Sequence, residues 1–182
     1  MIGRKNHRLY ILFLLIVACV CNSENQVVSL QIQHNNDSIT ITPHLFFNTS
    51  TDIKEAIDNG VKLNIIAKTQ LYEPRTWWFD NTISNVKVTL EVSYFTLSKL
   101  YVVRNKTTGK QISFNSYEQL WKEFEQLMKI EIKTIVNNNS WVKMRIMLDK
   151  RALPTVMQLP TLFNSDWDVD TQWHQQKIFV NE

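Results

Sequence analysis

The chain has little of three residue types that usually shape a fold: 2 cysteines, 3 glycines and 4 prolines among 182 residues. Both cysteines, Cys19 and Cys21, lie near the N-terminus, so the rest of the chain has no disulfide, no cysteine nucleophile and no thiolate metal ligand. No segment is rich enough in proline, glycine or serine to form an interdomain linker. We therefore expect a single domain, residues 24–182, that is stabilised by packing alone.

Long apolar runs are also lacking, except for one at the N-terminus. It spans residues 9–21, follows the basic residues Arg4, Lys5 and Arg8, and precedes small and polar residues. This three-part order is typical of a secretory signal. The run of 13 residues is shorter than the ~20 that a membrane-spanning helix needs. We therefore expect residues 1–23 to be a signal peptide and the protein to be exported.

Two cleavage points fit this leader. Residues 16–19 (IVAC) have the shape of a lipobox, after which a lipoprotein signal of residues 1–18 would be removed and Cys19 acylated. Alternatively, Cys21 and Ser23 are the small residues of an ordinary cleavage site, and the cut follows Ser23. The first alternative predicts a domain anchored to a membrane through Cys19, and the second a domain without a lipid anchor.

Neither sign of charge is in excess once the leader is set aside. The three basic residues of the leader account for the whole formal net charge of +3, so the remainder of the chain is neutral. Domains that bind nucleic acid usually carry a clear excess of basic residues. We therefore expect no nucleic-acid partner.

Residues that carry catalysis or hold metals are sparse as well. The three histidines after the leader are widely separated and have no partner at ligand spacing. Residues 166–170 (DWDVD) resemble the start of a calcium loop, but Thr171 and Lys177 replace its glycine and its bidentate glutamate. A serine elbow, a phosphate-binding loop and a dinucleotide fingerprint are all missing. We assign no catalytic residue, metal or cofactor, and an enzyme is not indicated.

Alternation of apolar and polar residues dominates the chain after the leader and predicts strands. It covers residues 28–32, 39–41, 61–71, 86–94, 100–103, 112–114, 142–148 and 172–180. In the first of these, Val28, Leu30 and Ile32 are expected to share the buried face. We expect an α+β, mainly β fold: an antiparallel twisted sheet or sandwich of seven to eight strands.

Two helices are expected between the strands. Ser116 begins a capping box for residues 116–130, whose apolar residues form one stripe at helical spacing. This amphipathic helix should cover one side of the sheet. Asp52, with a glutamate three residues later, predicts the cap of a short helix over residues 52–59.

The stretch at residues 73–80 (EPRTWWFD) places three aromatic residues in succession. Successive side chains of a strand point to opposite faces, so the three cannot share one core. We interpret the triplet as a strand held between two layers, the helix 116–130 and the segment 149–171, which is apolar but has no period. If Trp78 is buried in this way, Trp78→Ala should lower the free energy of unfolding by about 3–5 kcal/mol.

The order of four segments carries a family resemblance. They are residues 53–61 (IKEAIDNGV), 77–80 (WWFD), 148–154 (LDKRALP) and 166–173 (DWDVDTQW). With these segments the chain resembles, from residue 27 to the C-terminus, the bacterial exported family called domain of unknown function 4390. The resemblance implies a periplasmic protein of Gram-negative bacteria, often encoded beside a nitrogen-regulation-type sensor kinase. It implies no activity, because none is established for the family.

Two functions remain open. The first is a non-catalytic module of the cell envelope that binds a protein partner, such as a sensor kinase, through aromatic residues, which are favoured at interfaces. The second is binding of a small molecule or glycan, with hydrolysis as an extension, in a cleft lined by aromatic side chains. The candidate residues for these sites are Arg75, Trp77, Trp78, Asp80, Trp167, Asp168 and Trp173.

Overall fold

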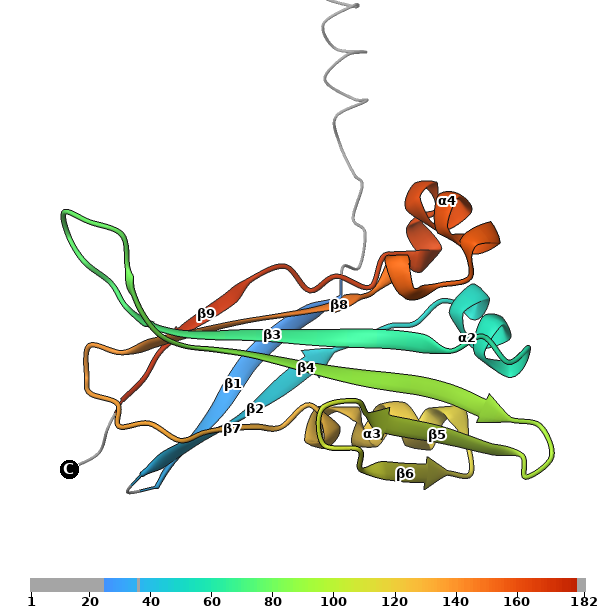
Figure 1. Ribbon diagram of the computed structural model, residues 1–182, viewed down its shortest axis with the longest axis horizontal. Coiled ribbons are helices and arrows are strands. Elements are labelled where there is room, and N and C mark those ends of the chain that lie inside the picture. The colour runs from blue at the N-terminus through green and yellow to red at the C-terminus, as the bar shows by residue number, and fades with distance from the viewer. Residues whose placement is uncertain (1–24, 36, 180–182) are drawn as a thin grey trace, which may run out of the picture.

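The structure is a computed structural model that describes residues 25–35 and 37–179 (Figure 1). The expected signal peptide, Cys19 and both cleavage points lie outside the described residues. Within the described ranges, no helix is both long enough and apolar enough to cross a bilayer.

Strands are the main secondary structure of the described chain. They are β1 (Gln26–Asn35), β2 (Ser38–Phe46), β3 (Leu63–Glu73), β4 (Asn81–Phe95), β5 (Leu100–Asn105), β6 (Gln111–Phe114), β7 (Ile130–Ile132), β8 (Trp141–Leu148) and β9 (His174–Lys177). A large sheet has the order β6-β5-β4-β3-β8-β9 and a small sheet the order β1-β2-β7, with every pair antiparallel. The expected mainly β, antiparallel fold is confirmed, and its strands are divided between two sheets.

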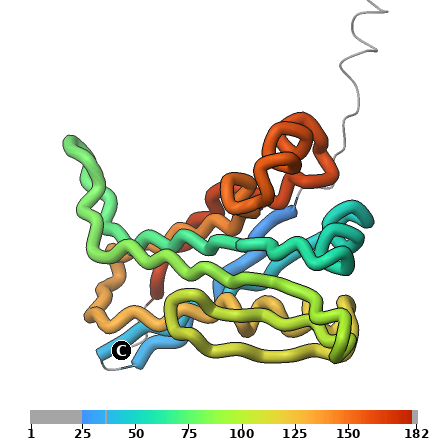
Figure 2. Tube along the Cα trace, turned by 45° about the vertical axis from the view of Figure 1, so that its right-hand side comes forward, coloured from blue at the N-terminus to red at the C-terminus, as the bar shows by residue number. Residues whose placement is uncertain are grey.

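The small sheet and α3 (Tyr117–Leu127) cover one face of the large sheet (Figures 1 and 2). Along β3, alternate residues such as Ile65 and Ala67 point to this face and are fully buried. They share one core with Ile39 and Ile41 of β2 and with Phe124 of α3. The opposite face of the large sheet carries charged side chains.

The helix expected over residues 116–130 is α3. Its cap is Ser116, whose Oγ accepts a hydrogen bond from the backbone N–H of Gln119 over 3.1 Å. The short helix is α2 (Thr51–Asp58), but its cap is Ser50, whose Oγ accepts from the N–H of Ile53, and not Asp52.

The segment 149–171 contains a helix that its sequence does not indicate. α4 (Thr155–Phe163) lies between two short 3-10 turns, Lys150–Ala152 and Ser165–Trp167. Pro160 lies inside α4, and the helix turns no apolar stripe to the core: its buried residue is Thr161, and most of its apolar residues are exposed. The expected packing of the segment is therefore confirmed only in part, at Leu153 and Trp167, which are 3% and 6% exposed.

The expected burial of Val28 in the first strand is wrong, although Leu30 is buried and Ile32 packs, partly buried, against the core as expected. A register shift between Val27 and Ser29 marks a β-bulge in β1, and it places an extra residue on that strand. As a result Val27 and Leu30 are buried, whereas Val28 is 57% exposed. Alternation alone does not reveal such an insertion.

The interpretation of the aromatic triplet as a buried strand is also wrong. Residues 74–80 form the loop at the tip of the long β3–β4 hairpin, beyond the last strand pair, Glu73 with Asn81. The exposed fractions of Trp77, Trp78 and Phe79 are 92%, 76% and 85%. The hairpin extends away from the rest of the domain at one end (Figures 1 and 2), so no second layer covers its tip.

Candidate binding surface

The outer face of the large sheet, meaning the face turned away from the small sheet, carries a row of three basic residues. Lys68 of β3 lies directly opposite Lys87 of β4 and Arg145 of β8 in the strand register. Side chains at such positions have Cβ atoms about 4.5–5.5 Å apart, and like charges there destabilise strand pairing. The sheet therefore holds three cations side by side at a cost in folding stability.

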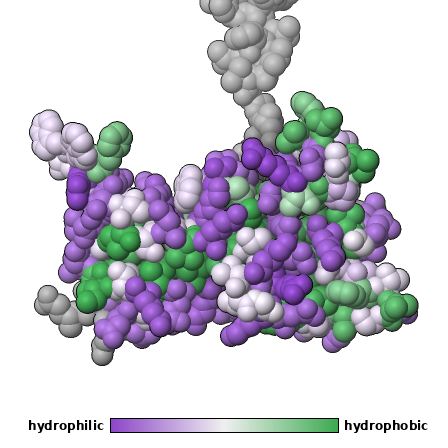
Figure 3. All heavy atoms as spheres, viewed as in Figure 1, coloured by the Kyte–Doolittle hydropathy of each residue, from purple (hydrophilic) through white to green (hydrophobic). Residues whose placement is uncertain are grey.

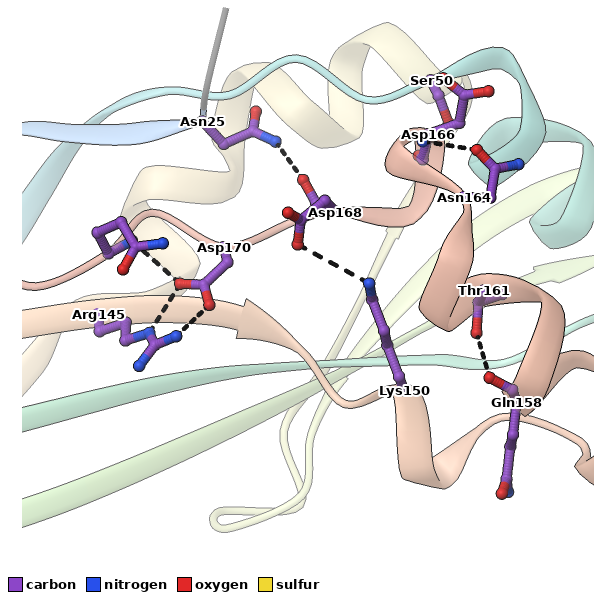
Figure 4. A network of polar contacts seen from close by, with 11 residues as sticks. Asn25, Ser50, Arg145, Lys150, Gln158, Thr161, Asn164, Asp166, Asp168 and Asp170 are labelled. Atoms are coloured by element: carbon purple, nitrogen blue, oxygen red, sulfur yellow. Dashed lines mark hydrogen bonds and ion pairs between the residues drawn. The ribbon is translucent and has the colours of Figure 1, made fainter. Parts of the chain in front are cut away.

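Arg145 is the member of this row with a carboxylate partner. Its Nε donates to Oδ1 of Asp170 over 2.7 Å, and its Nη2 donates to Oδ2 of the same carboxylate (Figure 4). Burial alone would raise the pKa of Asp170, but the hydrogen bonds from Arg145 and from the N–H of Gln172 lower it. Among the described residues, no carboxylate lies within 4.0 Å of the ammonium nitrogen of Lys68 or Lys87. Their two positive charges stay uncompensated at short range.

A concave region of about 660 Å³ adjoins the row. Its lining includes Lys68 and Lys87, two further basic residues, Lys150 and Arg151, and the apolar side chains of Ile66, Met147 and Leu162. Three aspartates, Asp149, Asp168 and Asp170, also line it, and Oδ1 of Asp168 lies 3.8 Å from Nζ of Lys150. With four basic and three acidic residues, the lining combines apolar surface with an excess of one positive charge, and the lysines without a carboxylate partner, Lys68 and Lys87, lie at its border with the row.

A lysine is placed between two aromatic rings further along the outer face. Nζ of Lys143 lies 5.1 Å from the ring centroid of Tyr72 and 5.4 Å from that of Trp173. Both distances allow cation–π attraction. Trp173 is 45% exposed, so this cluster is part of the accessible surface.

The candidate residues of the sequence analysis do not form one cleft. Arg75, Trp77, Trp78 and Asp80 lie on the exposed hairpin tip. Trp167 is in the core, whereas Asp168 and Trp173 are exposed along the segment that leads into β9. From Ile66 in the concave region to the end of β3 at Glu73 the strand advances about 20 Å. The tip and the concave region are therefore separate parts of the surface.

A second exposed apolar surface belongs to α4. Val156, Leu159, Leu162 and Phe163 are 84%, 69%, 59% and 89% exposed. The helix contains no charged residue. Figure 3 shows its hydrophobic colouring at the end of the domain away from the hairpin tip. Apolar groups gathered on a surface in this way usually mark an interaction site.

The start of the described chain is tied to the neighbourhood of α4 (Figure 4). The side-chain Nδ2 of Asn25 donates to the carbonyl oxygen of Asp168 over 3.3 Å, and its Oδ1 accepts from the N–H of Asn48 over 2.6 Å. Ser50 Oγ donates to the carbonyl oxygen of Asp166 over 2.6 Å. These bonds join β1, the cap of α2 and the segment that follows α4.

Sequence reasoning missed Lys68, Lys87 and Lys150 as members of a site. The alternation in β3 and β4 already places both strand lysines on a polar face, but it does not say which residue lies opposite which. That pairing depends on the hairpin register, which sequence alone leaves open when the connecting loop is as long as residues 74–80.

No metal site accompanies this surface in the described part of the chain, where no three histidine, cysteine, aspartate or glutamate side chains are grouped to hold an ion.

A comparison with protein families identifies the class to which the chain belongs. The model of the family described as domain of unknown function (DUF4390) matches residues 22–177. The chain belongs to this family. The comparisons of this chain with curated proteins and with solved structures found no match.

Proposed function

We propose that this protein is an exported, non-catalytic module of the bacterial cell envelope that binds an acidic segment of a protein partner on the outer face of its large sheet. The leader at residues 1–23 supports the location. A sensor kinase of the envelope is one partner that fits the family's usual gene neighbourhood.

The observation that carries the proposal is the direct opposition of Lys68 and Lys87 on neighbouring strands. Folding alone would favour a neutral or oppositely charged residue at one of these positions. Positive charge that is retained at a cost in stability is typical of a site that needs it for function. An extended acidic segment would place carboxylates over Lys68 and Lys87, which line one side of the concave region.

The cleft lined by Trp77, Trp78 and Trp167 is not favoured as a small-molecule or glycan site. The first two residues lie on the hairpin tip and the third is buried in the core. The outer face instead brings together basic residues from neighbouring strands, which suits a partner that lies across several strands.

Site-specific photo-crosslinking in living cells tests the proposal. A photoreactive residue at Asn85, an exposed neighbour of Lys87 on the same face of β4, should capture one acidic envelope protein, whereas the same residue at Lys122, on the exposed side of α3, should not. The affinity of the captured protein should then fall at least tenfold in Lys68→Gln/Lys87→Gln, since two ionic contacts are lost. The matched control, Lys122→Gln/Lys133→Gln, should bind as the wild type does.

Stability measurements separate a binding defect from misfolding. Because like charges are removed, Lys68→Gln/Lys87→Gln should unfold at the same urea concentration as the wild type or at a higher one. Equal capture from positions 85 and 122, or full affinity in the double variant, would contradict the proposal.

A further inference from the structure

The two exposed apolar surfaces project on the same side of the molecule. In Figures 1 and 2 the tip of the β3–β4 hairpin and α4 both rise beyond the β9 edge of the large sheet, at opposite ends of the domain. In Figure 3 the surface between them is mostly hydrophilic. The hairpin tip and α4 are therefore two separate apolar surfaces that face in one direction.

The distance between the two apolar surfaces favours a broad, flat binding partner. Leu162 of α4 and Ile66 of β3 line the same concave region, and the hairpin tip begins at residue 74, eight residues further along the chain. The part of β3 that separates the concave region from the tip is thus about 20 Å long. A lipid bilayer reaches both at once, because it is flat on this scale.

The composition of both contacts suits the boundary between lipid and water. The tip presents two tryptophans and a phenylalanine next to Arg75, all of them exposed. Tryptophan is enriched at the level of lipid headgroups, where its ring is partly apolar and its N–H is solvated. α4 follows the exposed Arg151, which has no carboxylate within 4.0 Å among the described residues and whose charge favours a surface of anionic lipids.

The chain enters the described domain on this same side. Asn25 is bonded to Asp168, close to α4. A lipid on Cys19, six residues earlier, would hold Asn25 within about 20 Å of a bilayer, the greatest length that six residues span. The apolar run at residues 9–21 brings the same part of the chain to the membrane during export.

From these observations we infer that the β3–β4 hairpin tip and α4 dock the domain onto a lipid surface, with Trp77, Trp78, Phe79, Leu159 and Phe163 entering its headgroup region. This inference goes beyond the proposed function, because it concerns other residues and a different class of partner. It gives the domain a fixed orientation, in which the hairpin and α4 support it at both ends.

Fluorescence quenching by brominated lipid tests the docking. The full chain is bound to vesicles of phosphatidylethanolamine and phosphatidylglycerol (3:1), part of which carry bromine on the acyl chains. Quenching of the wild type is expected mainly from the two tip tryptophans, because these are highly exposed, whereas Trp167, which follows α4, is buried in the core. Trp77→Phe/Trp78→Phe keeps the apolar tip and should lose most of the quenching while it stays bound.

Matched serine variants test the contribution of α4. Leu159→Ser/Phe163→Ser should reduce tip quenching by half or more, since the second support is removed. Phe95→Ser/Leu97→Ser changes two exposed apolar residues at the β4–β5 turn and should leave quenching unchanged.

Three results would overturn the inference. The first is quenching that persists in Trp77→Phe/Trp78→Phe, and the second is an equal loss in both serine variants. The third is a tip that stays accessible to acrylamide on vesicles but becomes protected by an envelope protein, which would make the tip a protein interface. Because the serine and phenylalanine variants leave Lys68 and Lys87 in place, their outcome is independent of partner binding on the outer face.

Discussion

The side-chain amide of Gln176 pairs with the backbone of Leu30 in both directions. The N–H of Leu30 donates to Oε1 of Gln176 over 3.0 Å, and Nε2 of Gln176 donates to the carbonyl oxygen of Leu30 over 3.0 Å. The glutamine thus takes the place of a neighbouring strand at the free edge of β1. Since Gln176 belongs to β9, this pair joins the small sheet to the large one.

Replacing Gln176 with alanine should therefore weaken the whole domain. The N–H and the carbonyl group of Leu30 are partly buried and would lose their partners, which costs about 1–3 kcal/mol. Urea unfolding measures the loss. Gln31→Ala, at an exposed position of β1, is the control and should change stability by no more than about 0.5 kcal/mol. Equal effects of the two variants would mean that the pair does not join the sheets.

Alanine substitution should have a small effect on stability at one tryptophan and a large effect at another. Trp78→Ala removes an exposed side chain and should alter the free energy of unfolding by less than about 0.5 kcal/mol. Trp167→Ala removes a buried one and should cost about 3–5 kcal/mol. Thermal or urea unfolding of both variants checks this. A large loss in Trp78→Ala would show that the tip is packed in solution.

Tyr101 should make stability sensitive to alkaline pH. Burial and the hydrogen bond that its hydroxyl donates to Asp58 raise the pKa of Tyr101 to about 12. The unfolded chain releases this proton near pH 10. The stabilisation is thus complete below about pH 10 and is lost as the pH rises toward 12. Between pH 10 and pH 12 the free energy of unfolding should fall less in Tyr101→Phe than in the wild type. The control Tyr94→Phe, which leaves Tyr101 in place, should show the same fall as the wild type.

The ion pair of Arg145 and Asp170 should make stability sensitive to acid. Because the folded state lowers the pKa of Asp170, the stabilisation is complete above the unfolded pKa, near 4, and is lost as the pH falls further. At pH 7 the variant Asp170→Asn should be less stable by about 1 kcal/mol, since the pair is only partly buried. The difference from the wild type should shrink as the pH is lowered to 2. Asp166→Asn, at an exposed position, serves as the control.

Local sequence signals predicted those elements whose cause is local. The strand β8 follows from the strict alternation of its residues, and α3 follows from its apolar stripe and the cap at Ser116. α4 and β7 were missed, because one has no apolar stripe and the other has only three residues. The β-bulge after Val27 was missed because it changes the phase of a strand without changing its composition.

The candidate surface was less predictable, because it depends on contacts between distant segments. Trp77 and Trp78 were expected to be covered by a second layer. They are exposed because the hairpin extends past the small sheet, and the sequence does not indicate how far it extends. The charge row required the pairing of Lys68 with Lys87 and with Arg145, which lies far away in the sequence. Asp168 and Trp173 were named from the sequence as site candidates together with Trp167, and no local signal separates the two exposed residues from the buried one.

The two hydrogen bonds of the Asn25 side chain define how far the N-terminus can be trimmed. Its bonds to Asp168 and Asn48 make this residue a structural part of the domain. Cleavage before Cys19 and cleavage after Ser23 both retain Asn25, so either route leaves an intact domain. Proteolysis even two residues further would release the segment that follows α4 from the start of β1. Asn25 is therefore the first residue that a shortened form of the protein must keep.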